Sequence, residues 1–338
     1  MAKRAKALIL APFAQRWVDR LGEQLNVTYE PWIESRRLHD PKVLAARIRQ
    51  ERFAVVIVEA DFLFAEAFAA PSLRVAGVCR NALNQVDLKA ATERGIPVIH
   101  TPARNAVAVA ELVLGLMLSL ARRMPAAHAW TKGGQWTNPI DSYIEFRGRE
   151  LAGSTVGIVG LGHIGVEVAQ RVRALGARPV AYDPYVSPLK ARALGVRLLS
   201  LPALMRRADF ITLHLPATKA TERLIDGAMI ALMKPDAYLL NTGAGAALDH
   251  DALAEALRAG RIAGAALDVF PGHILPLDSP LRGLDNIVLT PHIGGATGET
   301  VERHSRMIAE DVERFLRGDE PRRLANPEAL DRPRRRGR

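Results

Sequence analysis

The chain has 338 residues, of which 49% are hydrophobic and 24% are charged, so it is long enough for two domains with buried cores. Its single cysteine, Cys79, excludes a disulfide framework and a thiolate metal centre, and no residue spacing predicts a metal site. Five arginines in the last seven residues supply half of the net charge of +10, and no nucleic-acid-binding signature accompanies them, so a nucleic-acid partner is not expected.

The apolar segments of the first half of the chain are too short to cross a membrane. Ala7–Leu10 follows a basic start and imitates a signal peptide, but it lacks a small-residue cleavage pattern, so we interpret it as a first β-strand. Residues 106–121 include Glu111 and fall short of the roughly 20 residues that a spanning helix needs. We therefore expect a cytoplasmic protein. Residues 326–338, rich in arginine, are expected to form a disordered tail.

Residues 1–103 alternate short apolar runs with stretches of helical periodicity, a pattern typical of a parallel sheet covered by helices. The expected strands are Ala7–Leu10, Val55–Val58, Leu73–Cys79 and Ile96–Ile99. A long apolar helix is expected from Asn105 to Arg123. Residues 124–150 have mixed polarity and are interpreted as an arm or extended connection.

A strand, a glycine-rich turn and a helix are predicted at residues 154–175. Thr155–Val159 is apolar and runs into Gly160-Leu161-Gly162-His163-Ile164-Gly165. The first glycine permits the turn, the second lets backbone amides approach a pyrophosphate, and the third lets the helix pack closely. The next apolar run ends at Asp183, where a carboxylate can accept a hydrogen bond from a ribose 2′-hydroxyl and disfavour a 2′-phosphate. The sequence therefore predicts a dinucleotide site that prefers NAD to NADP.

The alternation of strands and helices continues to residue 317. The further strands are expected at Arg178–Tyr182, Phe210–Leu215, Ala237–Asn241, Ile262–Val269 and Ile287–Leu289, and a helix from Glu299 to Arg317 is expected to return to the first domain. We therefore predict an α/β protein with two doubly wound parallel-sheet domains. One comprises residues 1–103 and 296–325, and the other residues 104–295, with an interdomain helix and an arm at 105–150.

Several motifs in this order resemble the D-isomer-specific 2-hydroxyacid dehydrogenases. They are Asn84-Gln-Val-Asp-Leu88, Arg94-Gly-Ile-Pro-Val98, Val109-Ala-Glu111, Tyr182-Asp183-Pro184, His214-Leu-Pro216, Ala266-Leu-Asp-Val-Phe270 and Thr290-Pro-His-Ile-Gly-Gly295, together with the glycine turn. The resemblance implies a Rossmann-type NAD-binding domain inserted into a flavodoxin-like substrate domain. It also implies a small-molecule substrate and a homodimer joined through the NAD-binding domains.

The resemblance further assigns residues to the cofactor. The NAD-binding set that it implies is Gly160, Gly162, His163, Ile164, Gly165, Tyr182, Asp183, Pro184, His214, Leu215, Pro216, Thr221, Thr242, Gly243, Ala244, Asp268, His292 and Gly294.

The catalytic positions agree with the family pattern only in part. The family's histidine maps onto His292, which would exchange a proton with the substrate oxygen during hydride transfer. The family's arginine and glutamate positions hold Ala244 and His273. Without the arginine, a substrate carboxylate needs another anchor, for which Arg80 is the candidate; weaker ones are Arg104, Arg147 and Lys219. We expect the two histidines to approach each other and to titrate as a coupled pair.

Three functions are compatible with this pattern. The preferred one is an NAD-dependent oxidoreductase that acts on an atypical hydroxy or carbonyl substrate, with His292 as the acid and base. The second is an NAD(H)-binding protein without turnover that acts as a scaffold or redox sensor, which would explain the two missing catalytic groups. The third is a non-redox enzyme on the same fold. Absorbance of NADH with candidate alcohols and carbonyls would discriminate among them.

Overall fold

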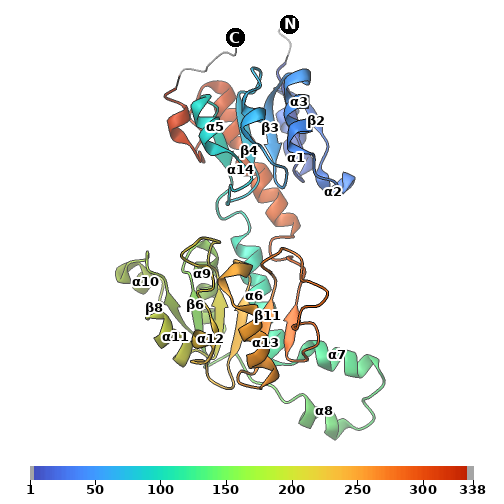
Figure 1. The fold of residues 1–338 in the computed structure, drawn as a ribbon, viewed down its shortest axis with the longest axis vertical. Helices are drawn as coiled ribbons and strands as arrows, with labels where there is room; N and C mark the ends of the chain where they lie inside the picture. Colours follow the sequence, from blue (N-terminus) through green and yellow to red (C-terminus); the bar gives the residue numbers. More distant parts are fainter. Residues whose placement is uncertain (1–3, 333–338) are drawn as a thin grey trace. The chain divides into compact units, whose positions relative to one another are not determined.

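The computed structural model describes residues 4–332, which form two compact units. We call the described residues up to Arg104 and from Thr297 onward the terminal unit, and Asn105–Ala296 the central unit. Each unit has its own parallel sheet and its own hydrophobic core (Figure 1). The predicted α/β class with two parallel sheets is thus confirmed.

Five parallel strands form the sheet of the terminal unit in the order β2-β1-β3-β4-β5, which is the flavodoxin-like order. They are β1 (Lys6–Ile9), β2 (Asn26–Tyr29), β3 (Phe53–Val58), β4 (Val75–Val78) and β5 (Val98–His100). The central strand β3 is buried along its whole length, as its continuous apolar run predicts. The apolar pattern does not predict β2, because this edge strand reads Asn-Val-Thr-Tyr and is only partly buried.

The helices of the terminal unit come from both ends of the chain. They are α1 (Gln15–Gly22), α2 (Trp32–Ser35), α3 (Pro41–Glu51), α4 (Ala65–Phe68), α5 (Leu88–Glu93), α14 (Gly298–Arg317) and the 3₁₀ helix η2 (Pro327–Ala329). The long helix α14 packs on α1, β4 and β5. Its Ile308 lies so close to β4 that a Cβ on Gly77 would be 3.0 Å from it, closer than most Cβ contacts, so the glycine helps α14 to approach the sheet.

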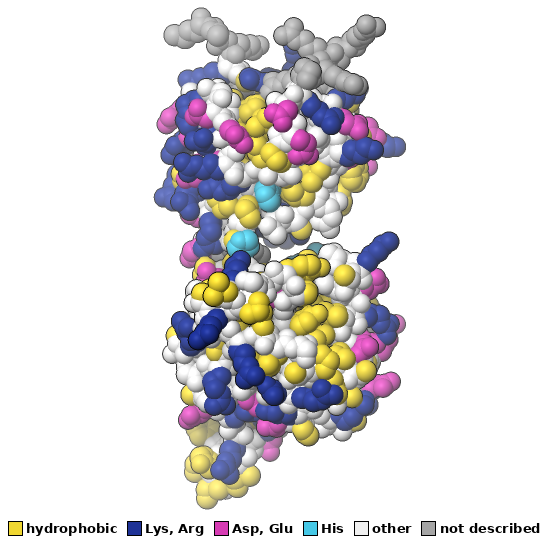
Figure 2. All heavy atoms as spheres, turned by 90° about the vertical axis from the view of Figure 1, so that its left-hand side faces the viewer, with side chains coloured by type: hydrophobic (Ala, Val, Ile, Leu, Met, Phe, Trp, Pro, Cys, Tyr) yellow, Lys and Arg dark blue, Asp and Glu magenta, His cyan; other side chains and the backbone are white. Residues whose placement is uncertain are grey.

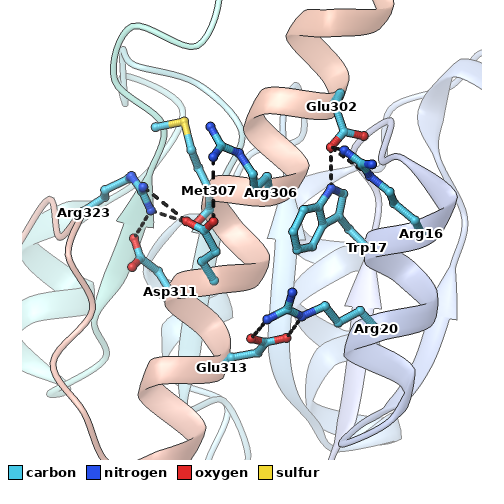
Figure 3. A network of polar contacts seen from close by, with 10 residues as sticks. Arg16, Trp17, Arg20, Glu302, Arg306, Met307, Asp311, Glu313 and Arg323 are labelled. Atoms are coloured by element: carbon cyan, nitrogen blue, oxygen red, sulfur yellow. Dashed lines mark hydrogen bonds and ion pairs between the residues drawn. The ribbon is translucent and has the colours of Figure 1, made fainter.

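Charged side chains reinforce the packing of α14 on α1 (Figure 3). The Arg20 guanidinium donates to both carboxylate oxygens of Glu313, at 2.5 and 2.6 Å, and Glu313 is nearly fully buried. Glu302 accepts from the Trp17 indole at 2.6 Å and from Arg16. A buried carboxylate is costly unless it is paired and hydrogen-bonded, so the pairing of Glu313 with Arg20 fixes how α14 lies on α1.

The segment after α14 differs from the expected disordered tail. Arg323 and Ala325 form backbone hydrogen bonds with His100 and Val98 of β5, and the buried Asn326 accepts from the Val98 amide at 2.7 Å. The prediction of disorder from residue 326 is therefore wrong at its start, because the Asn326 side chain satisfies backbone groups at the edge of the sheet. The arginine-rich residues 333–338 lie outside the described residues.

A buried histidine on α14 is held in its neutral form. His304 lies between Arg104, which contacts its Nδ1 at 2.8 Å, and the Pro12 carbonyl, which is 2.7 Å from its Nε2. Burial is the main cause that lowers the pKa of His304 from 6.5 to about 4, and the charge of Arg104 adds to the effect. The ring therefore donates to Pro12 through Nε2 and accepts from Arg104 through Nδ1.

This environment predicts that the terminal unit loses stability on mild acidification. The folded pKa of about 4 lies below the ordinary value of 6.5, so the unfolded chain binds more protons between these two pH values. The free energy of unfolding should fall by about 2 kcal/mol between pH 7 and pH 5 from this group alone. Chemical denaturation at both pH values should show a smaller fall for His304→Gln. An equal fall in the free energy of unfolding of His304→Gln would contradict the assignment of this effect to His304. The control is His128→Gln, which changes a histidine at an exposed position.

Seven parallel strands form the sheet of the central unit in the order β12-β11-β10-β9-β6-β7-β8. Read from β8, this is the Rossmann order with one further strand. The strands are β6 (Thr155–Val159), β7 (Arg178–Tyr182), β8 (Arg197–Leu198), β9 (Phe210–Leu213), β10 (Tyr238–Asn241), β11 (Gly264–Leu267) and β12 (Ile287–Leu289). All but the two-residue edge strand β8 correspond to the apolar runs of the sequence.

Helices cover both faces of this sheet. They are α6 (Ala106–Ala121), α9 (His163–Ala174), α10 (Pro188–Ala193), α11 (Leu201–Arg207), α12 (Gly227–Ile230), α13 (His250–Arg258) and the 3₁₀ helix η1 (Gly245–Ala247). The long apolar helix α6 packs on α9 and on β10, β11 and β12. Within residues 4–332, no helix combines the length and the apolar composition that a membrane crossing requires.

The predicted arm is helical rather than extended. It contains α7 (Met124–Lys132) and α8 (Pro139–Glu145), and neither helix has a buried residue. Prolines lie in the first turn of both helices, where the missing amide hydrogen costs nothing, so they start helices here instead of preventing them. Phe146 at the end of α8 packs edge-on against Trp130 of α7, with ring centroids 5.4 Å apart, and so holds the two helices together.

Candidate functional site

The residues that the sequence assigns to the cofactor lie at the carboxyl ends of the strands of the central unit. The glycine turn follows β6, Asp183 follows β7, His214 follows β9, Thr242 follows β10, Asp268 follows β11, and His292 and Gly294 follow β12. Because every strand pair is parallel, these ends lie along one edge of the sheet. The strand order reverses between β6 and β9, which is the position where open α/β sheets bind ligands.

The glycine turn between β6 and α9 has the geometry of a phosphate cradle. Gly160 has φ +96°, a conformation that L side chains rarely adopt, and a Cβ there would lie 2.9 Å from the His214 carbonyl. A Cβ on Gly165 would lie 2.2 Å from the Gly160 carbonyl oxygen, so α9 can approach β6 only with glycine here. Gly162, the N-cap of α9, faces open space and leaves the first-turn amides accessible to an anion.

Asp183 both shapes the glycine turn and presents its charge beside it. Its Oδ2 accepts from the Leu161 amide at 2.8 Å, and its Oδ1 accepts from the Tyr185 amide at 2.8 Å. The side chain is half-buried, and each carboxylate oxygen can accept a second hydrogen bond. The carboxylate is therefore fixed in place and still able to accept a hydrogen bond from a ribose hydroxyl. Of its neighbours in the chain, Tyr182 is half-buried and Pro184 is exposed.

The histidine after β9 is half-buried, and its ring is held neutral. The Nε2 of His214 lies 3.1 Å from the Thr212 hydroxyl, and its Nδ1 lies 3.4 Å from the Thr242 hydroxyl. Burial lowers the pKa of His214 to about 3. This ring therefore packs the strand ends together and does not exchange protons near neutral pH. The Thr221 hydroxyl donates to the Pro216 carbonyl at 2.6 Å, so it closes the turn at 216–221.

Asp268 holds the loop that carries His292. Its Oδ1 accepts from the Thr290 hydroxyl at 2.6 Å and from the Ile293 amide at 2.8 Å. Its Oδ2 accepts from the Gly294 amide at 2.8 Å. Asp268 is 1% exposed, whereas His292 between these anchored residues is exposed. A buried carboxylate thus fixes the backbone on both sides of the proposed acid–base residue. The sequence assigns Asp268 to the cofactor and does not reveal this role.

His273 lies beside His292. The centroids of the two imidazole rings are 5.0 Å apart, with an angle of 65° between the ring planes. Both residues have left-handed backbones, with φ 69° and φ 57°, and both side chains are exposed. The approach of the two rings that the sequence predicts is therefore present in the central unit, although the residues are 19 positions apart in the chain.

Ala244 lies between two glycines that pack closely against the backbone of other segments. A Cβ on Gly243 would lie 2.9 Å from the Leu215 amide nitrogen, and a Cβ on Gly245 would lie 2.3 Å from the Phe270 carbonyl carbon. The Ala244 carbonyl accepts from the Asn241 side chain at 3.0 Å, and its methyl group is buried. The position therefore supplies no charge to the site.

Arg80, in the terminal unit, has an unusual environment for an arginine. It follows β4 and is half-buried, and no hydrogen bond or ion pair to its guanidinium exists among residues 4–332. Burial is the main cause that lowers the pKa of Arg80, and the charge of Arg104 acts in the same direction. The nearby carboxylate of Glu59 is already paired with Arg104 at 2.5 Å. A desolvated cation without a partner favours an anionic ligand.

The weaker candidates for an anchor are placed differently. Arg104 is engaged by Glu59 and His304, and Arg147 and Lys219 are exposed.

Comparisons with known proteins place these features in a family. Residues 114–294 match the model of the D-isomer-specific 2-hydroxyacid dehydrogenase NAD-binding domain. The chain is 41% identical over 313 residues to a D-3-phosphoglycerate dehydrogenase of Mycobacterium tuberculosis, covering 92% of this chain and 57% of that protein. It is 38% identical over 283 residues to a glyoxylate reductase of Thermofilum pendens, covering 83% of each. The TT0316 protein of Thermus thermophilus has a similar solved structure, with a TM-score of 0.84, 37% identity, and 95% of this chain and 99% of that chain covered. The chain spans less than two thirds of the length of the phosphoglycerate dehydrogenase.

Proposed function

The chain belongs to the D-isomer-specific 2-hydroxyacid dehydrogenase family, and on this premise we propose that it is an NAD-dependent oxidoreductase that interconverts a hydroxy and a carbonyl compound. The observation that carries the proposal is the loop of His292. Asp268 holds this loop at the same edge of the sheet as the glycine turn. An acid–base group next to a dinucleotide cradle is the minimum that such a reaction needs.

His292 exchanges a proton with the substrate oxygen. When bound, NADH would supply the hydride for reduction of the carbonyl carbon of the substrate. The imidazolium of His292 then gives its proton to the carbonyl oxygen, and in the oxidation direction the neutral ring takes the hydroxyl proton. Asp268 contributes by orienting the His292 loop through three hydrogen bonds, and it does not touch the reacting atoms.

We expect the substrate to differ from the usual substrates of the family. The reason is that Ala244 and His273 stand where the family pattern has an arginine and a glutamate. Without a guanidinium at position 244, a 2-carboxylate loses charge-assisted hydrogen bonds worth about 1.5–3 kcal/mol each. We propose that Arg80 holds the acidic group of the substrate instead, because its charge is half-buried and unpaired among the described residues.

The test is turnover of NADH with a panel of carbonyl compounds that includes glyoxylate, hydroxypyruvate and larger 2-keto acids, and of NAD with the matching alcohols. Turnover of at least one pair by the purified protein is expected. Tight NADH binding without turnover of any compound would favour the alternative of a redox-sensing scaffold. The observation that supports this alternative is the replacement of the family's arginine and glutamate by Ala244 and His273.

The cofactor is NAD(H), and we expect Asp183 to disfavour NADPH. Repulsion between its carboxylate and a 2′-phosphate should make NADPH binding at least about tenfold weaker than NADH binding, which is about 1.4 kcal/mol. Asp183→Ala should narrow this ratio in a calorimetric titration. Asp183→Asn separates charge from structure, because it keeps an oxygen acceptor for the Leu161 amide. NADPH binding as tight as NADH binding in the unmodified protein would contradict the assignment.

We also propose that the chain forms a homodimer through its helical arm. Ile140, Tyr143 and Ile144 of α8 are 65–74% exposed and lie at helical spacing on one side, and Trp136 before them is also exposed. Figure 2 shows hydrophobic side chains gathered at the end of the central unit where α8 lies in Figure 1. An apolar surface of this kind on a helix without buried residues favours a second copy of the chain as its partner.

The oligomeric state tests this surface. The double variant Tyr143→Asp, Ile144→Asp should sediment as a monomer, because two charges would be buried in the interface. Leu189→Asp on α10, which is 80% exposed, is the control and should leave the sedimentation coefficient unchanged. A dimer in the double variant would show that the arm is not the interface.

A further inference from the structure

We propose that His273 and His292 together bind one transition-metal ion of the class that prefers imidazole, such as Zn²⁺ or Cu²⁺. The proposal concerns the nitrogen atoms of these two rings and not the glycine turn after β6, where the dinucleotide phosphates are expected. Its binding part is independent of the proposed reaction, and its inhibitory part rests on the proposed role of His292.

The spacing of the two rings suits a shared ion. Two imidazoles on one tetrahedral Zn²⁺, with Zn–N distances of about 2.1 Å, have centroids roughly 5 Å apart. The His273 and His292 centroids are 5.0 Å apart, and the 65° angle between the ring planes keeps the rings from stacking face to face. The pair is edge-to-face, so the side chains would rotate to turn one nitrogen of each ring toward a shared ion.

The two backbones are held in place before any ion arrives. The His292 loop is tied to the buried Asp268 on both sides, and the His273 amide donates to the Phe270 carbonyl at 3.2 Å. Because the His292 loop is fixed, little backbone entropy is lost there when the two rings are brought onto one ion.

The remaining coordination positions belong to water or an exogenous ligand. Both side chains are exposed, so an ion can enter from solvent. Residues 4–332 contain no group of three or more histidine, cysteine, aspartate or glutamate side chains that suits a metal. The protein therefore supplies two ligands, which predicts a reversible site of micromolar-range affinity rather than a structural one.

A bound ion would occupy the lone pair that His292 needs for proton exchange. Metal binding and catalysis at His292 then exclude each other, so Zn²⁺ should act as a reversible inhibitor that a chelator removes. The replacement of a carboxylate by His273 in the family pattern adds the second nitrogen ligand that makes this possible.

The experiment is a calorimetric titration of the untagged protein with Zn²⁺, in the absence of cofactor and substrate, combined with electron paramagnetic resonance of the Cu²⁺ form. We expect one ion per chain and a Cu²⁺ spectrum with two nitrogen ligands. His273→Asn and His292→Asn should each weaken Zn²⁺ binding at least about tenfold and leave one nitrogen ligand, since even outer-shell changes cost 10- to 100-fold. His128→Asn, an exposed histidine of the arm, should bind as the unmodified protein does.

Two results would overturn the proposal: no stoichiometric Zn²⁺ binding by the unmodified protein, or unchanged binding in both variants. These outcomes do not depend on turnover, so they are distinguishable from failure of the proposed oxidoreductase function. Inhibition of NADH oxidation by Zn²⁺ and its reversal by a chelator then test the inhibitory part in the unmodified protein.

Discussion

Replacement of His292 by asparagine should lower kcat by about 100- to 10,000-fold while the protein still binds NADH, because a positioned proton-transfer group contributes that much to rate. Asparagine is the appropriate substitute, since it tolerates the left-handed backbone that His292 adopts at φ 57°. The exposed side chain contributes little packing, so the melting temperature should stay within a degree or two. Steady-state kinetics, NADH titration and thermal unfolding together measure the three quantities.

The matched control for this prediction is His128→Asn, which removes an exposed histidine from α7 and should leave kcat unchanged. Unaltered kcat in His292→Asn would refute the acid–base assignment. If NADH binding and kcat are both lost, the substitution disturbs the loop that Asp268 fixes. Asp268 would then have to be varied independently.

The sequence predicts the central strands well because burial on both faces leaves a continuous apolar run. β3 and β9 are buried along their whole lengths, and both coincide with such runs. The edge strands β2 and β8 are short and partly exposed, so no pattern marks them. The sequence does not predict the helices of the arm for a related reason. Helical periodicity of apolar residues arises where one face of a helix is buried, and α7 and α8 have no buried residue.

The sequence indicates the candidate residues and the approach of His273 to His292, but it does not reveal the hydrogen bonds that hold the site. The glycine turn and Asp183 act over short distances in the chain, so spacing alone indicates their relation. The link from Asp268 to the His292 loop joins two strand ends through side-chain hydrogen bonds, and only the fold brings them together. The same holds for Arg80, whose lack of a partner depends on the pairing of Glu59 with Arg104.

The second large effect is expected at Arg80. If Arg80 holds the acidic group of the substrate, then Arg80→Met removes charge-assisted hydrogen bonds and should raise KM roughly 10- to 150-fold, which corresponds to about 1.5–3 kcal/mol. Arg80→Lys keeps the charge but lacks the planar guanidinium, so its KM should lie between those of the unmodified protein and Arg80→Met. NADH affinity should be unchanged, because Arg80 is not among the residues assigned to the dinucleotide, which follow the strands of the central unit.

The stability of these variants separates an anchor from a structural arginine. A half-buried guanidinium without a hydrogen-bond partner among the described residues costs desolvation energy that nothing in the free protein offsets. Methionine has a similar length and no charge, so Arg80→Met should unfold at the same temperature as the unmodified protein or higher, although its KM is raised. Arg104→Met is the contrasting variant: it leaves Glu59 without its partner and should lower the melting temperature. A lower melting temperature in Arg80→Met with an unchanged KM would show that Arg80 stabilises the terminal unit and does not bind the substrate.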